Sequence, residues 1–235
     1  MESEALKKYK EMEAKRVSIN MKHLEQGVEF IDLYAAYIDE DVEIGAGTVI
    51  GPCVTLKGKT VIGEGCVIGQ NSRIEDSVIG DGVQVHSSVI VESRVGEETT
   101  VGPFAYLRPK SNVGSHCKIG DFVEVKNSNF GDGSKASHLT YIGDSDVGCG
   151  VNLGCGVVFV NYDGTNKYRS TVGDGAFIGC NSNLVSPVNV GEGAYVPAGS
   201  TVTEDVEGDA LYIARARGIQ KQGWVSEKGI LKKKK

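Results

Sequence analysis

The sequence predicts an all-β fold, a parallel β-helix written in hexapeptide repeats, and three observations carry that prediction. Aliphatic residues recur at every sixth position over most of the chain. Glycine very often follows the aliphatic residue, and a small or β-branched residue stands four places after it. Glycine is also frequent, with 32 of 235 residues, against a usual share of about 7%, and it shows no Gly-X-Y period of the collagen type.

The six-residue period fits neither an α-helix, with its period of about 3.6, nor a lone strand, with its period of about 2. It fits a short strand, a tight corner and the next strand. Three such sides close one coil, and roughly nine or ten coils stacked about 4.8 Å apart bury their apolar residues against each other. A β-sandwich would not keep this register for so long. The aliphatic positions are Ile38, Ile44, Ile50, Leu56, Ile62, Ile68, Ile74, Ile79, Val85, Val95, Val101, Leu107, Val113, Ile119, Val125, Val147, Leu153, Phe159, Val172, Ile178, Leu184, Val190, Val196 and Val202.

The register breaks twice. Between Val125 and Val147 the phase is lost, and between Phe159 and Val172 there is one residue too many. A solenoid accommodates insertions by extruding them as loops, and such loops often carry binding groups. We therefore expect a loop at each break, the second one around residues 161–167.

Two segments lie outside the repeat. Residues 1–27 contain a predicted helix over residues 4–26, with Gly27 as its stop. Residues 28–206 form the predicted β-helix domain. Residues 207–235 show no repeat and are expected to form an irregular tail, whose final lysine run, residues 232–235, is typical of a solvated end.

Composition narrows the function classes. The net charge of −6 gives no support for nucleic-acid binding. No apolar run approaches the about 20 residues of a membrane span, and the acidic N-terminus lacks the apolar core of a signal peptide, so we expect a soluble cytoplasmic protein. The six cysteines include no Cys-X-X-Cys pair, which disfavours a zinc site and favours free thiols.

Few side chains are candidates for chemistry. Of the four histidines, His138 lies in the first break, whereas the other three are expected at the surface. Imidazole is a natural general base near neutral pH, although a lone histidine is as often structural. Arg108 and Lys126 could hold a phosphate, although either alone is typical of a surface charge. Residues 161–167 could equally be a polar turn.

Five segments resemble a known family. They are Leu107-Arg-Pro109, residues 120–126, residues 133–144, residues 161–167 and Gln220-Lys-Gln-Gly-Trp224. Their order and spacing are similar to those of the bacterial bifunctional N-acetylglucosamine-1-phosphate uridyltransferase/glucosamine-1-phosphate acetyltransferases. The resemblance covers essentially the whole chain but only the C-terminal half of the family's proteins, including a linker helix, and it implies that the β-helix is left-handed.

The resemblance implies acetyl transfer from acetyl-CoA to the amine of glucosamine-1-phosphate, with His138 as general base, no metal in this step, and a homotrimer with sites between subunits. Glu124 is the residue that we expect to orient His138. The implied sugar-phosphate residues are Arg108, Lys126, Tyr141, Asn152, Asn161, Tyr162 and Lys167. The implied acetyl-CoA residues are Cys155, Asn161, Tyr162, Cys180, Ala198 and Arg215.

This sequence departs from the family pattern in three respects. Cys155 replaces an expected alanine, and Cys180 replaces an expected serine, whose hydroxyl is a better hydrogen-bond donor than a thiol. No glycine-rich nucleotide-binding loop precedes residue 38, so uridylyl transfer and its magnesium site are not expected.

Three alternatives remain open. A γ-type carbonic anhydrase uses the same prism but needs three histidines on zinc, and His86, His116 and His138 include no close pair. A β-helix that serves only for assembly would not need a histidine and a polar loop at the breaks. An acyltransferase acting on another amino sugar is the third alternative.

Overall fold

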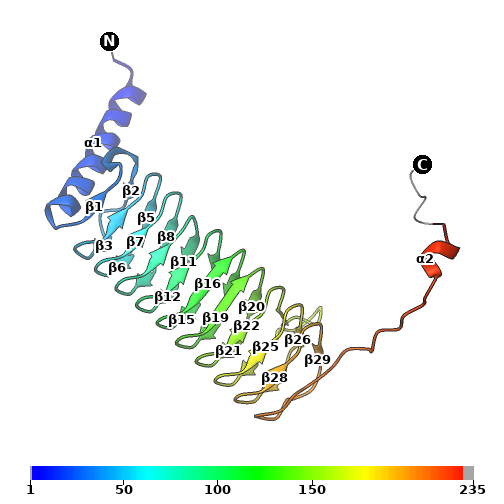
Figure 1. Cartoon of the computed structure of the whole chain (residues 1–235). Helices are drawn as coiled ribbons and strands as arrows, with labels where there is room; N and C mark the ends of the chain where they lie inside the picture. Colours follow the sequence, from blue (N-terminus) through cyan, green and yellow to red (C-terminus); the bar gives the residue numbers. More distant parts are fainter. Residues whose placement is uncertain (1, 230–235) are drawn as a thin grey trace.

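The computed structural model describes residues 2–229 and shows a long prism with a helix at one end and an extended tail at the other (Figure 1). The predicted left-handed parallel β-helix is confirmed. Three parallel sheets, here called A, B and C, contain ten, ten and nine strands. Each coil gives one strand to each sheet. Strands that are neighbours within a sheet are therefore three strands apart along the chain.

The strands are short, and each sheet runs the length of the prism. Sheet A consists of β1 Glu29–Phe30, β4 Val49–Ile50, β7 Val67–Ile68, β10 Gln84–Val85, β13 Thr100–Val101, β16 Lys118–Asp121, β19 Lys135–His138, β22 Asn152–Leu153, β25 Phe177–Ile178 and β28 Tyr195–Val196. Sheet B consists of β2 Tyr37–Ile38, β5 Thr55–Lys57, β8 Arg73–Glu75, β11 Val89–Val91, β14 Tyr106–Leu107, β17 Glu124–Lys126, β20 Tyr141–Gly143, β23 Val158–Val160, β26 Asn183–Val185 and β29 Thr201–Val202. Sheet C consists of β3 Glu43–Ile44, β6 Val61–Ile62, β9 Val78–Ile79, β12 Arg94–Val95, β15 Asn112–Val113, β18 Asn129–Phe130, β21 Ser145–Val147, β24 Ser170–Val172 and β27 Asn189–Val190.

The core is a column of apolar side chains, mostly aliphatic, one from each strand. Ile50, Leu56 and Ile62, from three consecutive sides, are at most 2% exposed. Burying each such side chain contributes about 1.5–3 kcal/mol. The small residues predicted at the corners are buried as well and tie the coils together. The Thr99 hydroxyl donates to the Gly114 carbonyl at 2.8 Å and accepts from the Cys117 N–H at 3.0 Å.

The prediction of a loop at the first break is wrong. The coil continues through β18, β19 and β20, and Phe130, Ala136 and Ile142 fill its interior with at most 1% exposure. The phase shifts because two sides are short. From Val125 to Phe130, and from Ile142 to Val147, the chain advances by five residues instead of six. His138 therefore lies at a regular corner.

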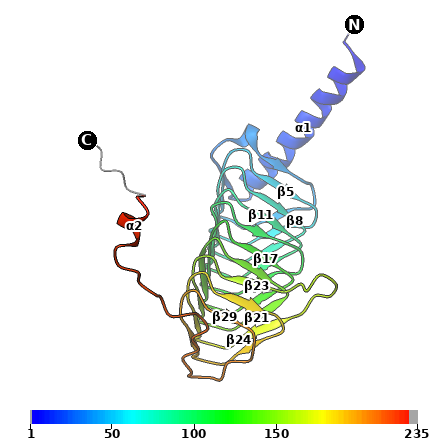
Figure 2. The same ribbon diagram turned by 90° about the vertical axis from the view of Figure 1, so that its right-hand side faces the viewer.

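The loop at the second break is confirmed, and Figure 2 shows it standing out from the prism. From Phe159 to Val172 the chain advances by 13 residues, against six from Leu184 to Val190 at the same corner of the next coil. The break that looks like one extra residue in the six-residue repeat is therefore one long corner in the structure. An antiparallel bridge between Tyr162 and Lys167 closes the loop.

The N-terminal helix α1, Glu4–Glu25, agrees with the predicted range. The Ser3 hydroxyl caps it by accepting from the Leu6 N–H at 3.2 Å, and Gly27 follows it with a φ of +92°. The prediction that His23 lies at the surface is wrong, because it packs against the first coil with 5% exposure. Burial and the nearby Lys22 charge lower the pKa of His23.

A 3-10 turn η1, Leu33–Ala35, joins the first coil to the helix, since the Asn20 side chain donates to the Leu33 carbonyl at 2.8 Å. No helix among residues 2–229 is long and apolar enough to cross a membrane.

The tail is more regular than predicted. Val206 and Leu211 form parallel bridges to Val190 and Tyr195, so the chain follows the last coil beyond residue 207. It then leaves the prism and ends in a short helix α2, Trp224–Glu227 (Figure 1). The lysine run at residues 232–235 lies outside the described residues.

Candidate functional site

The edge between sheets A and B carries a row of the predicted site residues. Ladder pairing aligns Ile119, Ala136, Leu153, Ile178 and Val196 on successive coils. The residues two places further along therefore also stack. This row, which we call the A–B edge row, consists of Asp121, His138, Cys155, Cys180 and Ala198.

His138 is held by a carboxylate in this row. Its Nδ1 lies 2.6 Å from Oδ1 of Asp121, and the hydrogen bond lowers the pKa of Asp121. The ionised Asp121 carboxylate accepts a hydrogen bond from Nδ1–H, which leaves the free lone pair of the imidazole on Nε2. The arrangement is that of a general base oriented by a carboxylate.

Glu124 does not orient His138, so that prediction is wrong. The Glu124 carboxylate accepts from Arg108 Nη1 at 2.7 Å on the outer face of sheet B. Sequence analysis missed Asp121 because a strict six-residue repeat does not reveal that this coil has one side of only five residues. Asp121 and His138 are direct ladder partners in β16 and β19.

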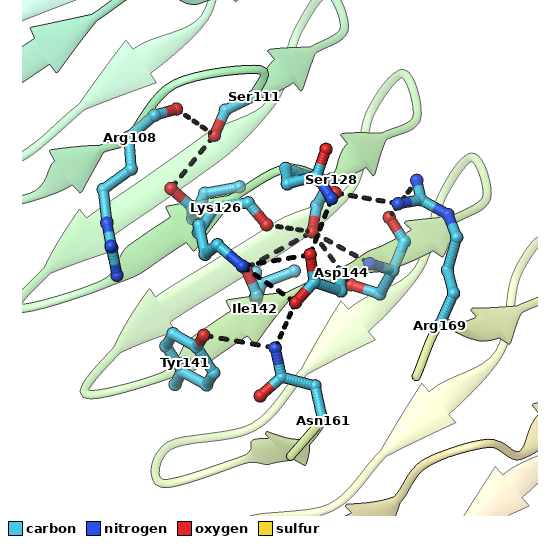
Figure 3. A network of polar contacts seen from close by, with 12 residues as sticks. Arg108, Ser111, Lys126, Ser128, Tyr141, Ile142, Asp144, Asn161 and Arg169 are labelled. Atoms are coloured by element: carbon cyan, nitrogen blue, oxygen red, sulfur yellow. Dashed lines mark hydrogen bonds and ion pairs between the residues drawn. The ribbon is translucent and has the colours of Figure 1, made fainter. Parts of the chain in front are cut away.

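A second group surrounds the Asp144 carboxylate at the corner between sheets B and C (Figure 3). Lys126 Nζ donates to both carboxylate oxygens at 2.9 and 3.1 Å. The side-chain amides of Asn127 and Asn161 donate at 2.6 and 2.5 Å. We call these four residues the Asp144 cluster. Sequence reasoning included Lys126 and Asn161 but missed the acid that joins them.

Asp144 is 7% exposed. Burial acts to raise the pKa of this carboxyl, but the hydrogen bonds from Asn127 and Lys126, with the Lys126 charge, outweigh it and lower the pKa. Asp144 is therefore an anion that holds a lysine and an amide of the loop together.

Arg108 and Tyr141 border the cluster. Arg108 lies beside Lys126, because Leu107 and Val125 are ladder partners, so two cations occupy neighbouring strands. The Tyr141 hydroxyl accepts from the Asn161 amide at 3.4 Å. Two adjacent cations with amide and hydroxyl groups at their side can bind a phosphorylated polyol.

The remaining predicted residues lie apart from this cluster. Asn152 is on β22 in sheet A, beside Lys135 and Phe177. Tyr162 and Lys167 are exposed on the loop. Arg215 donates from Nη1 to the Ala198 carbonyl and so ties the tail to the A–B edge row.

Among residues 2–229, no group of three or more His, Cys, Asp or Glu side chains is placed to hold a metal ion.

Replacing Asp144 with alanine should lower the free energy of unfolding by about 2–4 kcal/mol, because it leaves the Lys126 ammonium without its partner. Urea titration at pH 7 measures the change. Asp41→Ala, at an exposed position, is the matched control and should stay within about 0.5 kcal/mol of the parent. Equal effects of the two substitutions would contradict the structural role of Asp144.

Comparisons with known proteins agree with this picture. The family model for the GMPPB C-terminal domain matches residues 33–108. The bifunctional protein GlmU of Clostridium acetobutylicum is 58% identical over 214 residues, 91% of this chain and 47% of that protein. GlmU of Clostridioides difficile (strain 630) is 59% identical over 216 residues, 92% of this chain and 47% of that protein.

Among solved structures, the chain resembles LpxA, a UDP-N-acetylglucosamine acyltransferase from Bacteroides fragilis 9343, with a TM-score of 0.52 and 16% identity. The match covers 78% of this chain and 70% of that one and shows the fold alone. The chain spans about half the length of the curated relatives it matches. The resemblance predicted from the motifs is thus confirmed: over nine tenths of its length the chain is similar to one half of the bifunctional protein GlmU, a share consistent with the C-terminal half.

Proposed function

We propose that the chain transfers the acetyl group of acetyl-CoA to the amine of glucosamine-1-phosphate, giving N-acetylglucosamine-1-phosphate for UDP-N-acetylglucosamine biosynthesis. The observation that carries the proposal is the 2.6 Å contact between His138 and Asp121 at one end of the A–B edge row. The identity of 58% to a bifunctional GlmU supports it.

The chemistry needs a base for the attacking nitrogen. As the sugar amine attacks the thioester carbonyl, an N–C bond forms and the C–S bond breaks, and CoA leaves as the thiolate. His138 Nε2 takes the proton that the nitrogen loses. Asp121 stabilises the imidazolium that forms and fixes the ring orientation.

The Asp144 cluster and its neighbours are suited to the sugar phosphate. Arg108 and Lys126 would bind the phosphate, while Tyr141 and Asn161 would contact the sugar hydroxyls. Asp144 acts as a positioning residue, because it fixes both Lys126 and Asn161. Asn152 and Lys167, which lie apart from the cluster in one prism, would complete the sugar site, and Tyr162 would lie with Asn161 between sugar and acetyl group.

The A–B edge row is suited to the cofactor. From His138 to Ala198 it spans three coil steps, about 14 Å at 4.8 Å per step, which is a length over which the thiol arm of acetyl-CoA can lie. Cys155 and Cys180 stand between these ends. Arg215, anchored on Ala198, brings a cation for the nucleotide phosphates.

One prism does not close this site. His138 precedes β20 and Asp144 follows it, so the base and the phosphate cluster lie at opposite borders of sheet B. Beside the base, Phe104 and Phe122 are each 58% exposed, and their rings stack at 5.5 Å. A homotrimer would cover these rings and bring the edge row of one subunit to the cluster of another.

Sedimentation should give three times the chain mass of 25.0 kDa at micromolar concentration. Phe122→Asp should dissociate the trimer, because it places a carboxylate in an apolar contact, and should abolish acetylation, while circular dichroism shows that the prism stays folded. A parent protein that is monomeric yet fully active would contradict the shared site.

A thiol-release assay with acetyl-CoA tests the reaction. Glucosamine-1-phosphate should release CoA much faster than glucosamine or a nucleotide sugar amine. His138→Ala should lower kcat by about 10²–10⁴-fold with little change in KM, since it removes the base. His116→Ala, at an exposed corner, should retain parent activity. Faster release with another amine would assign a different acceptor, and near-normal acetylation by His138→Ala would refute the base.

Asp121→Asn should lower kcat by about tenfold or more, because an amide stabilises the imidazolium poorly. Glu124→Gln should raise KM for the sugar phosphate through Arg108 with little change in kcat. The reverse assignment of these two effects would make Glu124 the orienting residue.

A further inference from the structure

Two cysteines of the A–B edge row lie one above the other on adjacent coils. The Gly154 N–H donates to the Ile178 carbonyl at 2.8 Å, and the Asn181 N–H donates to the Cys155 carbonyl at 2.8 Å. These bonds continue the register in which Leu153 pairs with Ile178, so Cys155 and Cys180 occupy equivalent positions on adjacent coils. Cys155 is half-buried and Cys180 is exposed.

Residues at equivalent positions on adjacent coils have Cα atoms about 4.8 Å apart, within the about 4.4–6.8 Å range of disulfides. Their Cβ atoms point in the same direction, so the Cβ atoms must approach each other for an S–S bond to form. That adjustment strains the bond and makes it more easily reduced. The pair is therefore suited to reversible oxidation rather than to a permanent cross-link.

The other four cysteines have no such partner. Cys66 and Cys117 are 0% and 3% exposed, and burial raises the pKa of both thiols. Cys53 is bonded through its N–H to the Ala35 carbonyl, and Cys149 through its N–H to the Asp174 carboxylate. All six cysteines lie within residues 2–229, and in this range only Cys155 and Cys180 occupy equivalent positions on adjacent coils.

We propose that Cys155 and Cys180 form an oxidisable dithiol that peroxides convert into an intrachain disulfide across two coils. The exposed Cys180 thiolate attacks a peroxide oxygen, giving a sulfenic acid and water. The Cys155 thiolate then attacks the sulfenic sulfur, and a second water leaves. Hydrogen peroxide is reduced to two waters, the two thiols are oxidised to the disulfide, and a dithiol restores them by exchange.

The disulfide would close the path to the base. Cys155 lies one coil from His138 as well as from Cys180, because Ala136 pairs with Leu153. The S–S bond would reduce the space along the A–B edge row next to the His138 imidazole. This effect on activity rests on the proposed function, whereas formation of the disulfide does not.

The cross-link is tested by mass spectrometry on the full chain treated with hydrogen peroxide. Trypsin places Cys149 and Cys155 in the peptide 136–167 and Cys180 in the peptide 170–215. The experiment therefore uses the Cys149→Ser variant, in which a bond between these peptides can only join Cys155 to Cys180. We expect this linked pair after peroxide and its loss after dithiothreitol. Absence of the linked pair, with both thiols still alkylatable or over-oxidised, overturns the proposal.

The activity arm uses the same samples. Peroxide should reduce acetylation by the Cys149→Ser protein about tenfold or more, since small displacements near reacting groups have large effects, and dithiothreitol should restore it. Cys155→Ala and Cys180→Ser, each compared with its own reduced form, should lose this reversible inhibition. A cross-linked protein that keeps full activity overturns the gating. Cross-linking in a protein that is inactive when reduced would refute the proposed function alone.

Discussion

Parallel hydrogen bonds between coils fix the height of every residue on this prism, and the site depends on that spacing. The close approach of the coils is most severe next to His138. A Cβ on Gly120 would lie 1.9 Å from the Ser137 carbonyl oxygen, so only glycine lets β16 and β19 pair there. That pairing is what brings the Asp121 carboxylate to His138. The order of residues along an edge thus follows from the backbone hydrogen bonds between coils. These bonds position each side chain of the row without a further side-chain contact.

Departures from the repeat supply what a regular prism lacks. Short sides between Val125 and Phe130 and between Ile142 and Val147 keep the core closed while shifting which residues reach the edge. The long corner after Phe159 does the opposite and extrudes a loop. The Asp144 carboxylate anchors the start of this loop through Asn161 at 2.5 Å. The regular coils therefore act as the frame, and changes in side length place the polar groups.

The sequence was sufficient to predict the prism, the range of α1 and the second loop, because each follows from local periodicity and turn residues. It did not predict the partners of His138 or Lys126. Those partners follow from ladder register, and one short side changes the register of all residues beyond it. Asp121 and Glu124 are three residues apart in sequence, yet they lie on different sheets. His23 was misplaced for a related reason, since the packing of a helix against the first coil is a tertiary contact that spacing along the helix does not reveal.

The charges of the Asp144 cluster and its neighbour Arg108 would make a sugar-phosphate site selective for its ligand rather than a general binder of anions. Arg108 is paired with Glu124 at 2.7 Å, and Lys126 with Asp144 at 2.9 Å, so the cluster is close to neutral before a ligand arrives. A free anion gains little from a neutral cluster, because it must compete with carboxylates already in contact. A sugar phosphate can add contacts to Tyr141 and Asn161 at the same time. Since Asp144 fixes Lys126 and Asn161 beforehand, these contacts require little reordering. Recognition then depends on the phosphate and the sugar being on one molecule.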